Sequence, residues 1–148
     1  MARLRSSLEL PDVPAQSAWQ LLTDWPAHGR WIPLTTVTID ADSPGSSGLG
    51  CRFTGRTGYG PVGFDDPMTV TRWQPPTAGT AGHCRVVKRG RWLAGWAEIE
   101  VQPTDAGCRL VWTEEVRPRW MPRAADPVLA RVGTVLFDRT LRQLAREL

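Results

Sequence analysis

The strand predicted over residues 108–116 carries the acidic residue best placed to do chemistry. In this stretch Leu110, Trp112, Glu114 and Val116 alternate with a more polar set, so they share one face of the strand. This face is the more apolar one and is expected to face the protein interior. A carboxylate there needs a partner, a water molecule or a shifted pKa. Glu114 is therefore either a polar anchor inside an apolar cavity or a strand-end residue that reaches solvent.

Other polar residues are weaker candidates for a site. Asp65 and Asp66 stand where a loop is expected to enter a strand, and neighbouring side chains on a strand point to opposite faces. The two carboxylates therefore cannot easily act together. Arg56 lies on a polar face of its own predicted strand. If this face is turned inward, Arg56 is a possible counter-ion for Glu114 or for an acidic ligand; if not, it is an exposed arginine.

The sequence predicts no metal site and no cofactor. His28 and His83 are far apart, and neither has a cysteine or a second histidine three or four residues away. Each is expected to be an ordinary surface or loop histidine. No Cys–His pair has the spacing of an iron–sulfur ligand set, and no phosphate-binding loop or GxSxG motif is present. The glycine-rich stretches 48–50 and 58–63 are expected to be turns or loops.

A short basic run raises the question of nucleic acid. Arg85, Lys88, Arg89 and Arg91 stand close to Trp92, a combination of basic and aromatic residues that nucleic-acid-binding proteins use. The run is brief, however, and the net charge of the chain is only +3. We therefore interpret it as the solvated end of a hairpin and expect no nucleic acid partner.

Length and composition indicate one ordinary globular domain over residues 1–148. Hydrophobic residues make up 41% of the chain and charged residues 22%, which are globular values. No apolar run approaches the roughly 18 residues of a membrane span, and the N-terminus does not have the pattern of a secretory signal. The three scattered cysteines suit a reducing compartment. We expect a cytoplasmic protein that is a monomer or a homodimer.

The longest predicted element is a helix over residues 124–148. Its apolar positions recur at steps of three and four and share one face: Leu129, Val132, Gly133, Leu136, Phe137, Thr140, Leu141, Leu144 and Leu148. Arg131, Asp138, Arg139, Arg142 and Arg146 are expected on the opposite face. Leu136 is thus predicted to be buried and Arg139 to be exposed.

The residues before this helix are predicted to form short strands joined by turns. Strands are expected over residues 3–10, 35–39, 51–57, 68–73, 84–89, 94–101 and 108–116, with two short helices after the first strand, over 15–25 and 27–32. Strands joined by short loops are antiparallel. The predicted fold class is α+β: a curved antiparallel sheet of about seven strands wrapped around the long C-terminal helix.

The order of these elements and several local phrases resemble the START-like superfamily, also called SRPBCC or Bet v 1-like, and in particular its bacterial polyketide cyclase/dehydrase type. The phrases that carry the resemblance are residues 14–19 and 21–25 for a first helix, 28–31 for a second, 48–50 before a strand, 75–76 after one and 107–112 in the last strand. The resemblance covers the whole chain. It implies a helix-grip fold with a cavity for an apolar ligand between the sheet and the C-terminal helix.

The resemblance leaves the function open between several hypotheses. The first is a non-enzymatic binding protein for a hydrophobic small molecule of lipid, polyketide or aromatic type. The alternative is a polyketide aromatase/cyclase or dehydratase, which requires at least two titratable residues inside the cavity; a protein- or RNA-binding module is a weaker third. Catalytic residues remain unknown. The candidate ligand-binding residues are Trp25, Trp31, Arg56, Phe64, Met68, Trp73, Trp96, Trp112, Glu114, Leu129, Val132 and Leu136.

Overall fold

Seven antiparallel strands form one sheet in the order β1-β7-β6-β5-β4-β3-β2 in a computed structural model that describes residues 2–148. The strands are β1 (Ala2–Pro11), β2 (Thr35–Ile39), β3 (Arg52–Tyr59), β4 (Val62–Gln74), β5 (Gly82–Lys88), β6 (Leu93–Pro103) and β7 (Gly107–Pro118). The helices are α1 (Ala15–Leu22), α2 (Asp126–Ala145) and two short 3-10 helices, η1 (Trp25–Arg30) and η2 (Arg123–Ala125). This is the predicted α+β helix-grip fold.

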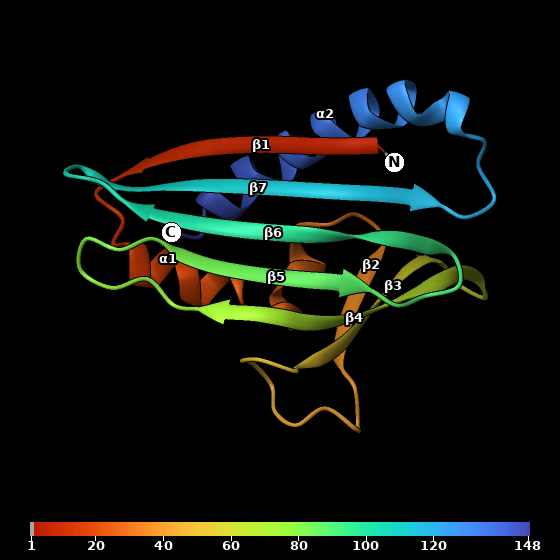
Figure 1. Ribbon diagram of the computed structural model, residues 1–148, viewed down its shortest axis with the longest axis horizontal. Helices are drawn as coiled ribbons and strands as arrows, with labels where there is room; N and C mark the ends of the chain where they lie inside the picture. Colours follow the sequence, from red (N-terminus) through yellow and green to blue (C-terminus); the bar gives the residue numbers. More distant parts are fainter. Residues whose placement is uncertain (1) are drawn as a thin grey trace.

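The helices lie on one face of the sheet. In Figure 1, α1 lies behind the lower strands, and α2 passes behind β7 and emerges beyond β1. The core between sheet and helices holds large side chains from both layers, including Trp19, Leu22, Trp25, Ile99 and Leu110. None of the helices within residues 2–148 is long and apolar enough to cross a membrane.

Strand alternation was predicted correctly where the strands are regular. In β1, Leu4 and Leu10 are buried while Arg3 and Arg5 are exposed. In β6, Ala97, Ile99 and Val101 are all buried and alternate with half-buried residues. Side chains on a strand point alternately to its two faces, so one apolar set per strand is sufficient to build the inner face of the sheet.

The glycine-rich stretch 58–63 is not the loop that we expected. Gly58 pairs with Gly63 and Tyr59 pairs with Val62, so the ladder between β3 and β4 continues to a tight turn. A Cβ atom on Gly58 would lie 2.2 Å from the carbonyl oxygen of Val62. The glycines therefore permit a close approach of two paired strands rather than a flexible loop, and β4 begins six residues earlier than predicted, at Val62 instead of residue 68.

The helix α2 begins and ends within the predicted range, but its buried face is only partly the predicted one. Leu141 and Leu144 are buried as predicted, whereas Val132 and Leu136, predicted on the same face, are each 53% exposed. A Cβ atom on Gly133 would lie 2.7 Å from the methyl groups of Leu4, which shows how closely this part of the helix approaches β1.

The polar contacts of the helix agree with this orientation. Asp138, expected on the solvent face, accepts a hydrogen bond from the Ser6 hydroxyl. Farther along the chain, just beyond the helix, Glu147 accepts a hydrogen bond from the Trp31 indole and forms an ion pair with Arg30. The helix is therefore held against β1 and η1, and the face that carries Leu136 is turned outward.

The orientation of α2 predicts unequal costs for two truncations. Leu141→Ala should lower the free energy of unfolding by about 2–5 kcal/mol, because the removed side chain is 2% exposed and leaves a cavity. Leu136→Ala on the same helix should cost less than about 1 kcal/mol, because its side chain already contacts water. Urea denaturation of both variants measures the difference. Equal losses would show that the helix lies on the sheet by the face predicted from periodicity.

Candidate functional site

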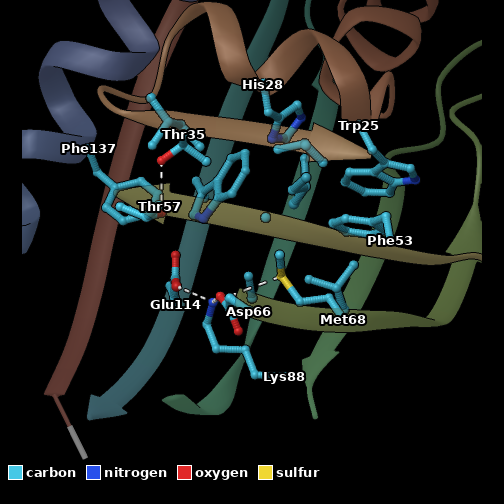
Figure 2. Close-up of a pocket in the computed structure, with 17 residues that line it drawn as sticks. Trp25, His28, Thr35, Phe53, Thr57, Asp66, Met68, Lys88, Glu114 and Phe137 are labelled. Atoms are coloured by element: carbon cyan, nitrogen blue, oxygen red, sulfur yellow. Dashed lines mark hydrogen bonds and ion pairs between the residues drawn. The ribbon is translucent and has the colours of Figure 1, made fainter. Parts of the chain in front are cut away.

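A cavity of about 180 Å³ lies between the inner face of the sheet and the helical layer. Figure 2 shows it with α2 at the left, η1 above and the strands β3 and β4 crossing below. The residues that line it come from η1 and the turn after it, from six of the strands and from α2: Trp25, His28, Ile32, Thr35, Val37, Phe53, Gly55, Thr57, Asp66, Met68, Val86, Lys88, Ala97, Ile99, Trp112, Glu114 and Phe137.

Aromatic rings form much of the wall of this cavity. The rings of Trp25 and Phe53 are stacked, with their centroids 4.3 Å apart and an angle of 8° between their planes. Trp112 contacts Phe137 at 5.6 Å and His28 at 5.8 Å, measured between ring centroids. Flat, rigid rings arranged in this way suit an apolar or aromatic ligand.

Three charged side chains meet at the polar end of the cavity. The ammonium nitrogen of Lys88 lies 2.5 Å from Asp66 Oδ2 and 3.3 Å from Glu114 Oε1. The three side chains are only 6%, 10% and 8% exposed, respectively. Figure 2 shows them together on the side of the cavity away from His28. We call Lys88, Asp66 and Glu114 the buried ion cluster.

Lys88 stays protonated in this environment. Burial alone would lower the pKa of its ammonium group, but the charges and hydrogen bonds of Glu114 and Asp66 outweigh that effect, and the pKa is raised above its ordinary value. Lys88 is therefore a hydrogen-bond donor and a fixed positive charge at neutral pH. It is not a neutral amine that could attack a carbonyl group.

The buried ion cluster leaves hydrogen-bonding capacity unused. The second carboxylate oxygen of Asp66, Oδ1, is buried and has no hydrogen-bond partner within residues 2–148, and the same holds for the indole nitrogen of Trp112. Both residues line the cavity. Buried polar atoms are seldom left unpaired, because each costs about 1–3 kcal/mol. The indole nitrogen of Trp25, which also lines the cavity, is buried without a partner as well. The lining residues therefore hold one acceptor and two donors that a ligand could pair.

His28 is a second polar residue of the cavity, and it is buried rather than on the surface as we expected. Its Nε2 lies 2.8 Å from the carbonyl oxygen of Leu22. A carbonyl can only accept, so Nε2 donates, and Nδ1 of the neutral ring carries no proton. Burial lowers the pKa of His28 to about 4, which outweighs the opposing effects of this hydrogen bond and of Asp24. The imidazole is therefore neutral at pH 7.

Four of the twelve predicted ligand-binding residues lie together at the cavity: Trp25, Met68, Trp112 and Glu114. Glu114 is on the inner face of β7 beside Trp112, as strand alternation predicted. That these four contact a ligand stays a prediction. The other eight do not line this cavity.

These eight residues lie in parts of the fold away from the cavity lining. Arg56 is half exposed and pairs with Asp65 at 3.1 Å, on the opposite face of the sheet from the buried ion cluster, while Phe64 lines a separate shallow depression. Trp96 donates a hydrogen bond to Glu115 on the outer face.

The remaining five belong to the core or to the long helix. Trp73 follows a register shift in β4 and packs edge-on against Trp19 of α1. Trp31 is buried beside His28 and bonds Glu147. Leu129, Val132 and Leu136 are on α2 but do not line the cavity, whereas Phe137 of the same helix does.

Lys88, Asp66 and His28 are the functional candidates whose role in the site sequence reasoning did not predict. Lys88 is the only lysine among the basic residues of the chain, which are otherwise arginine. It follows Cys84 and Val86 at steps of two, so it shares their buried face and is not part of a basic surface run. This alternation was the available signal. Within the part of the chain described, no cluster of three His, Cys, Asp or Glu side chains could hold a metal ion.

Comparison with known proteins agrees with this architecture. The family model described as "Polyketide cyclase / dehydrase and lipid transport" matches residues 1–148. The chain belongs to this family. No curated protein sequence matches it.

Solved structures share the fold of this polyketide cyclase/dehydrase and lipid transport family member. TTHA0849 from Thermus thermophilus superposes with a TM-score of 0.73 at 13% identity, covering 97% of this chain and 94% of that one. XoxI from Bacillus cereus superposes with a TM-score of 0.70 at 12% identity, covering 99% of this chain and 95% of that one. The hypothetical protein jhp0584 from Helicobacter pylori superposes with a TM-score of 0.68 at 13% identity, covering 99% of this chain and 86% of that one. Identities this low establish the fold alone.

The buried ion cluster predicts an unusual pH dependence for Lys88→Met. Without the ammonium group, the carboxylates of Asp66 and Glu114 are buried unpaired, which should cost about 3–5 kcal/mol at pH 7. Acid removes charge from carboxylates, so part of the lost stability should return as the pH falls. Denaturant unfolding at several pH values measures this recovery.

Arg85→Met is the matched control, because Arg85 is also on β5 but pairs with Glu98 on the more exposed face. It should cost about 1 kcal/mol or less with no recovery in acid. In the wild type, the ion pairs that raise the pKa of Lys88 stabilise the folded protein fully at pH values below the ordinary lysine pKa of about 10.4. This stabilisation is lost as the pH rises through the pKa that Lys88 has in the folded protein. Parallel pH profiles of Lys88→Met and wild type would contradict the buried ion cluster.

Proposed function

We propose that this protein binds a hydrophobic small molecule in the cavity between the sheet and the helices. The observation that carries the proposal is a cavity with aromatic walls and a few convergent polar groups at one end, which is typical of ligand sites. Membership of a family of polyketide cyclases, dehydrases and lipid transport proteins supports the same function.

The size of the cavity limits what it can hold. An apolar cavity of about 150 Å³ accepts one benzene molecule in an engineered lysozyme. The present cavity, at about 180 Å³, has room for one aromatic ring with a short substituent, or for one end of a longer molecule. Gly55 is part of its wall, and a Cβ atom there would make only ordinary contacts, the nearest at 3.8 Å to Thr35 and 3.9 Å to Met68. A larger residue at position 55 would therefore extend into the cavity without backbone strain.

Gly55→Leu should close the cavity while the fold is kept. Toluene, titrated by isothermal calorimetry, should bind the wild type and should lose at least tenfold in affinity for Gly55→Leu, because the new side chain takes the same space. The neighbouring Arg56→Leu is the matched control, since Arg56 is half exposed and pairs with Asp65 on the other face. It should bind toluene like the wild type. Circular dichroism verifies the fold of both variants, and equal affinities in all three proteins would place the binding site elsewhere.

A second candidate function is that of a polyketide aromatase/cyclase or dehydratase acting in the same cavity. The observation that favours it is the convergence of Asp66, Lys88 and Glu114 inside an apolar enclosure. A buried carboxylate can remove a proton from a carbon next to a carbonyl group, and the adjacent ammonium of Lys88 can stabilise the enolate oxygen that forms. Because Lys88 is protonated, its role in such a reaction is electrostatic.

Deuterium exchange distinguishes the two functions. Acetophenone carries one ring and a carbonyl group, and an enzyme of this kind should accelerate exchange of its methyl protons in D₂O, followed by NMR. Glu114→Gln should keep the fold, because Lys88 retains its contact with Asp66, and should reduce both ligand affinity and any exchange rate. Binding of acetophenone without exchange above the buffer rate would exclude proton abstraction. Identical binding and exchange in wild type and Glu114→Gln would mean that Glu114 takes no part in the site.

A further inference from the structure

The buried ion cluster has an imbalance of charge. It contains one cation, Lys88, and two carboxylates, Asp66 and Glu114, so it carries a net charge of −1 when all three groups are ionised. The other elements around the cavity do not correct this. His28 of η1 is neutral, β2 and β3 contribute the hydroxyl groups of Thr35 and Thr57, and α2 contributes Phe137. An uncompensated buried negative charge is costly, and a ligand can compensate it.

The position of the unpaired acceptor indicates where the compensating group would bind. Asp66 Oδ2 accepts the ammonium group of Lys88, whereas Oδ1 of the same carboxylate is buried without a partner inside residues 2–148. A group that satisfies Oδ1 must donate a hydrogen bond, since a carboxylate only accepts. A donor that is also positively charged satisfies the oxygen and the charge balance together.

The walls of the cavity also favour a cation attached to a ring. The faces of tryptophan and phenylalanine rings carry partial negative charge and attract organic cations, and Trp25, Phe53, Trp112 and Phe137 all line the cavity. Burial keeps His28 neutral, so within residues 2–148 it does not act as a second cation that competes for the carboxylates from the helical side. The volume of about 180 Å³ corresponds to one ring and a short arm.

We propose that the ligand of this cavity is a small aromatic amine in its protonated form, whose ammonium group donates to Asp66 Oδ1 while its ring lies among the aromatic side chains. With the amine bound, two cations and two carboxylates lie together. The selectivity for a cationic ligand comes from the buried ion cluster. This inference rests on the proposed binding function, which it narrows to one class of ligand.

Four compounds of nearly equal size separate the possibilities at pH 7: benzylamine as the cation, benzyl alcohol as a neutral donor, toluene as the apolar reference and benzoate as the anion. Calorimetric titration of the wild type should give benzylamine at least tenfold higher affinity than toluene or benzyl alcohol, and benzoate the weakest binding. Lys88 is the only lysine, so ¹⁵N-lysine labelling yields one side-chain ammonium signal, which benzylamine should shift.

The variant Asp66→Asn tests the source of the preference. It removes the excess negative charge and leaves Lys88 paired with Glu114, so the fold should persist, while the preference for benzylamine over toluene should fall at least tenfold. Asp65→Asn is the matched control, because Asp65 is the preceding residue on β4 and is exposed beside Arg56. This variant should behave as the wild type. If Asp66→Asn does not fold, the four titrations of the wild type decide the question alone.

The outcomes distinguish this inference from the function on which it rests. Toluene or benzyl alcohol binding as tightly as benzylamine overturns the amine but leaves a hydrophobic ligand site in place. Benzoate binding most tightly also overturns the amine, because the cavity would then use Lys88 to hold an anion. Failure of all four compounds to bind a folded wild-type protein overturns the proposed function and the inference with it.

Discussion

The ammonium group of Lys88 joins strands that are not neighbours in the sheet. Lys88 is on β5, Asp66 is on the adjacent β4, and Glu114 is on β7, with β6 in between. Glu114 pairs in register with Ala97 of β6, whose short side chain leaves room for the lysine to reach across. The interaction therefore depends on the bend of the sheet and on a small residue at the crossing point. Removing these three charged groups from water costs free energy, and breaking the buried ion pairs would strongly destabilise the fold. The surrounding structure must therefore keep them intact.

The aromatic wall and the buried ion cluster affect each other. Rings such as Trp112 keep water away from the charges, and electrostatic interactions are stronger where water is excluded. The same exclusion keeps His28 neutral, because burial lowers its pKa to about 4. The cavity consequently has an apolar body and one charged end, and its ligand should have two corresponding parts.

Most of the fold follows from local patterns that the sequence displays. Alternation in β1, β6 and β7 identified the inner faces of those strands, and hence the inward position of Glu114. The pattern of α2 was less decisive. Its apolar residues cover so wide an arc that two overlapping stripes, one with Leu136 and one with Leu141, fit the same periodicity. Only the packing against β1 selects between them.

The sequence by itself determined which residues share a strand face, because side-chain direction has a period of two and depends on nearest neighbours alone. It placed Glu114 inward and separated Asp65 from Asp66 on these grounds. Only the tertiary structure decided that Lys88 and Asp66, 22 residues apart, meet Glu114 in one cavity, and that His28 is buried beside Trp112. Such encounters depend on strand order, register and the bend of the whole sheet, which no local pattern encodes.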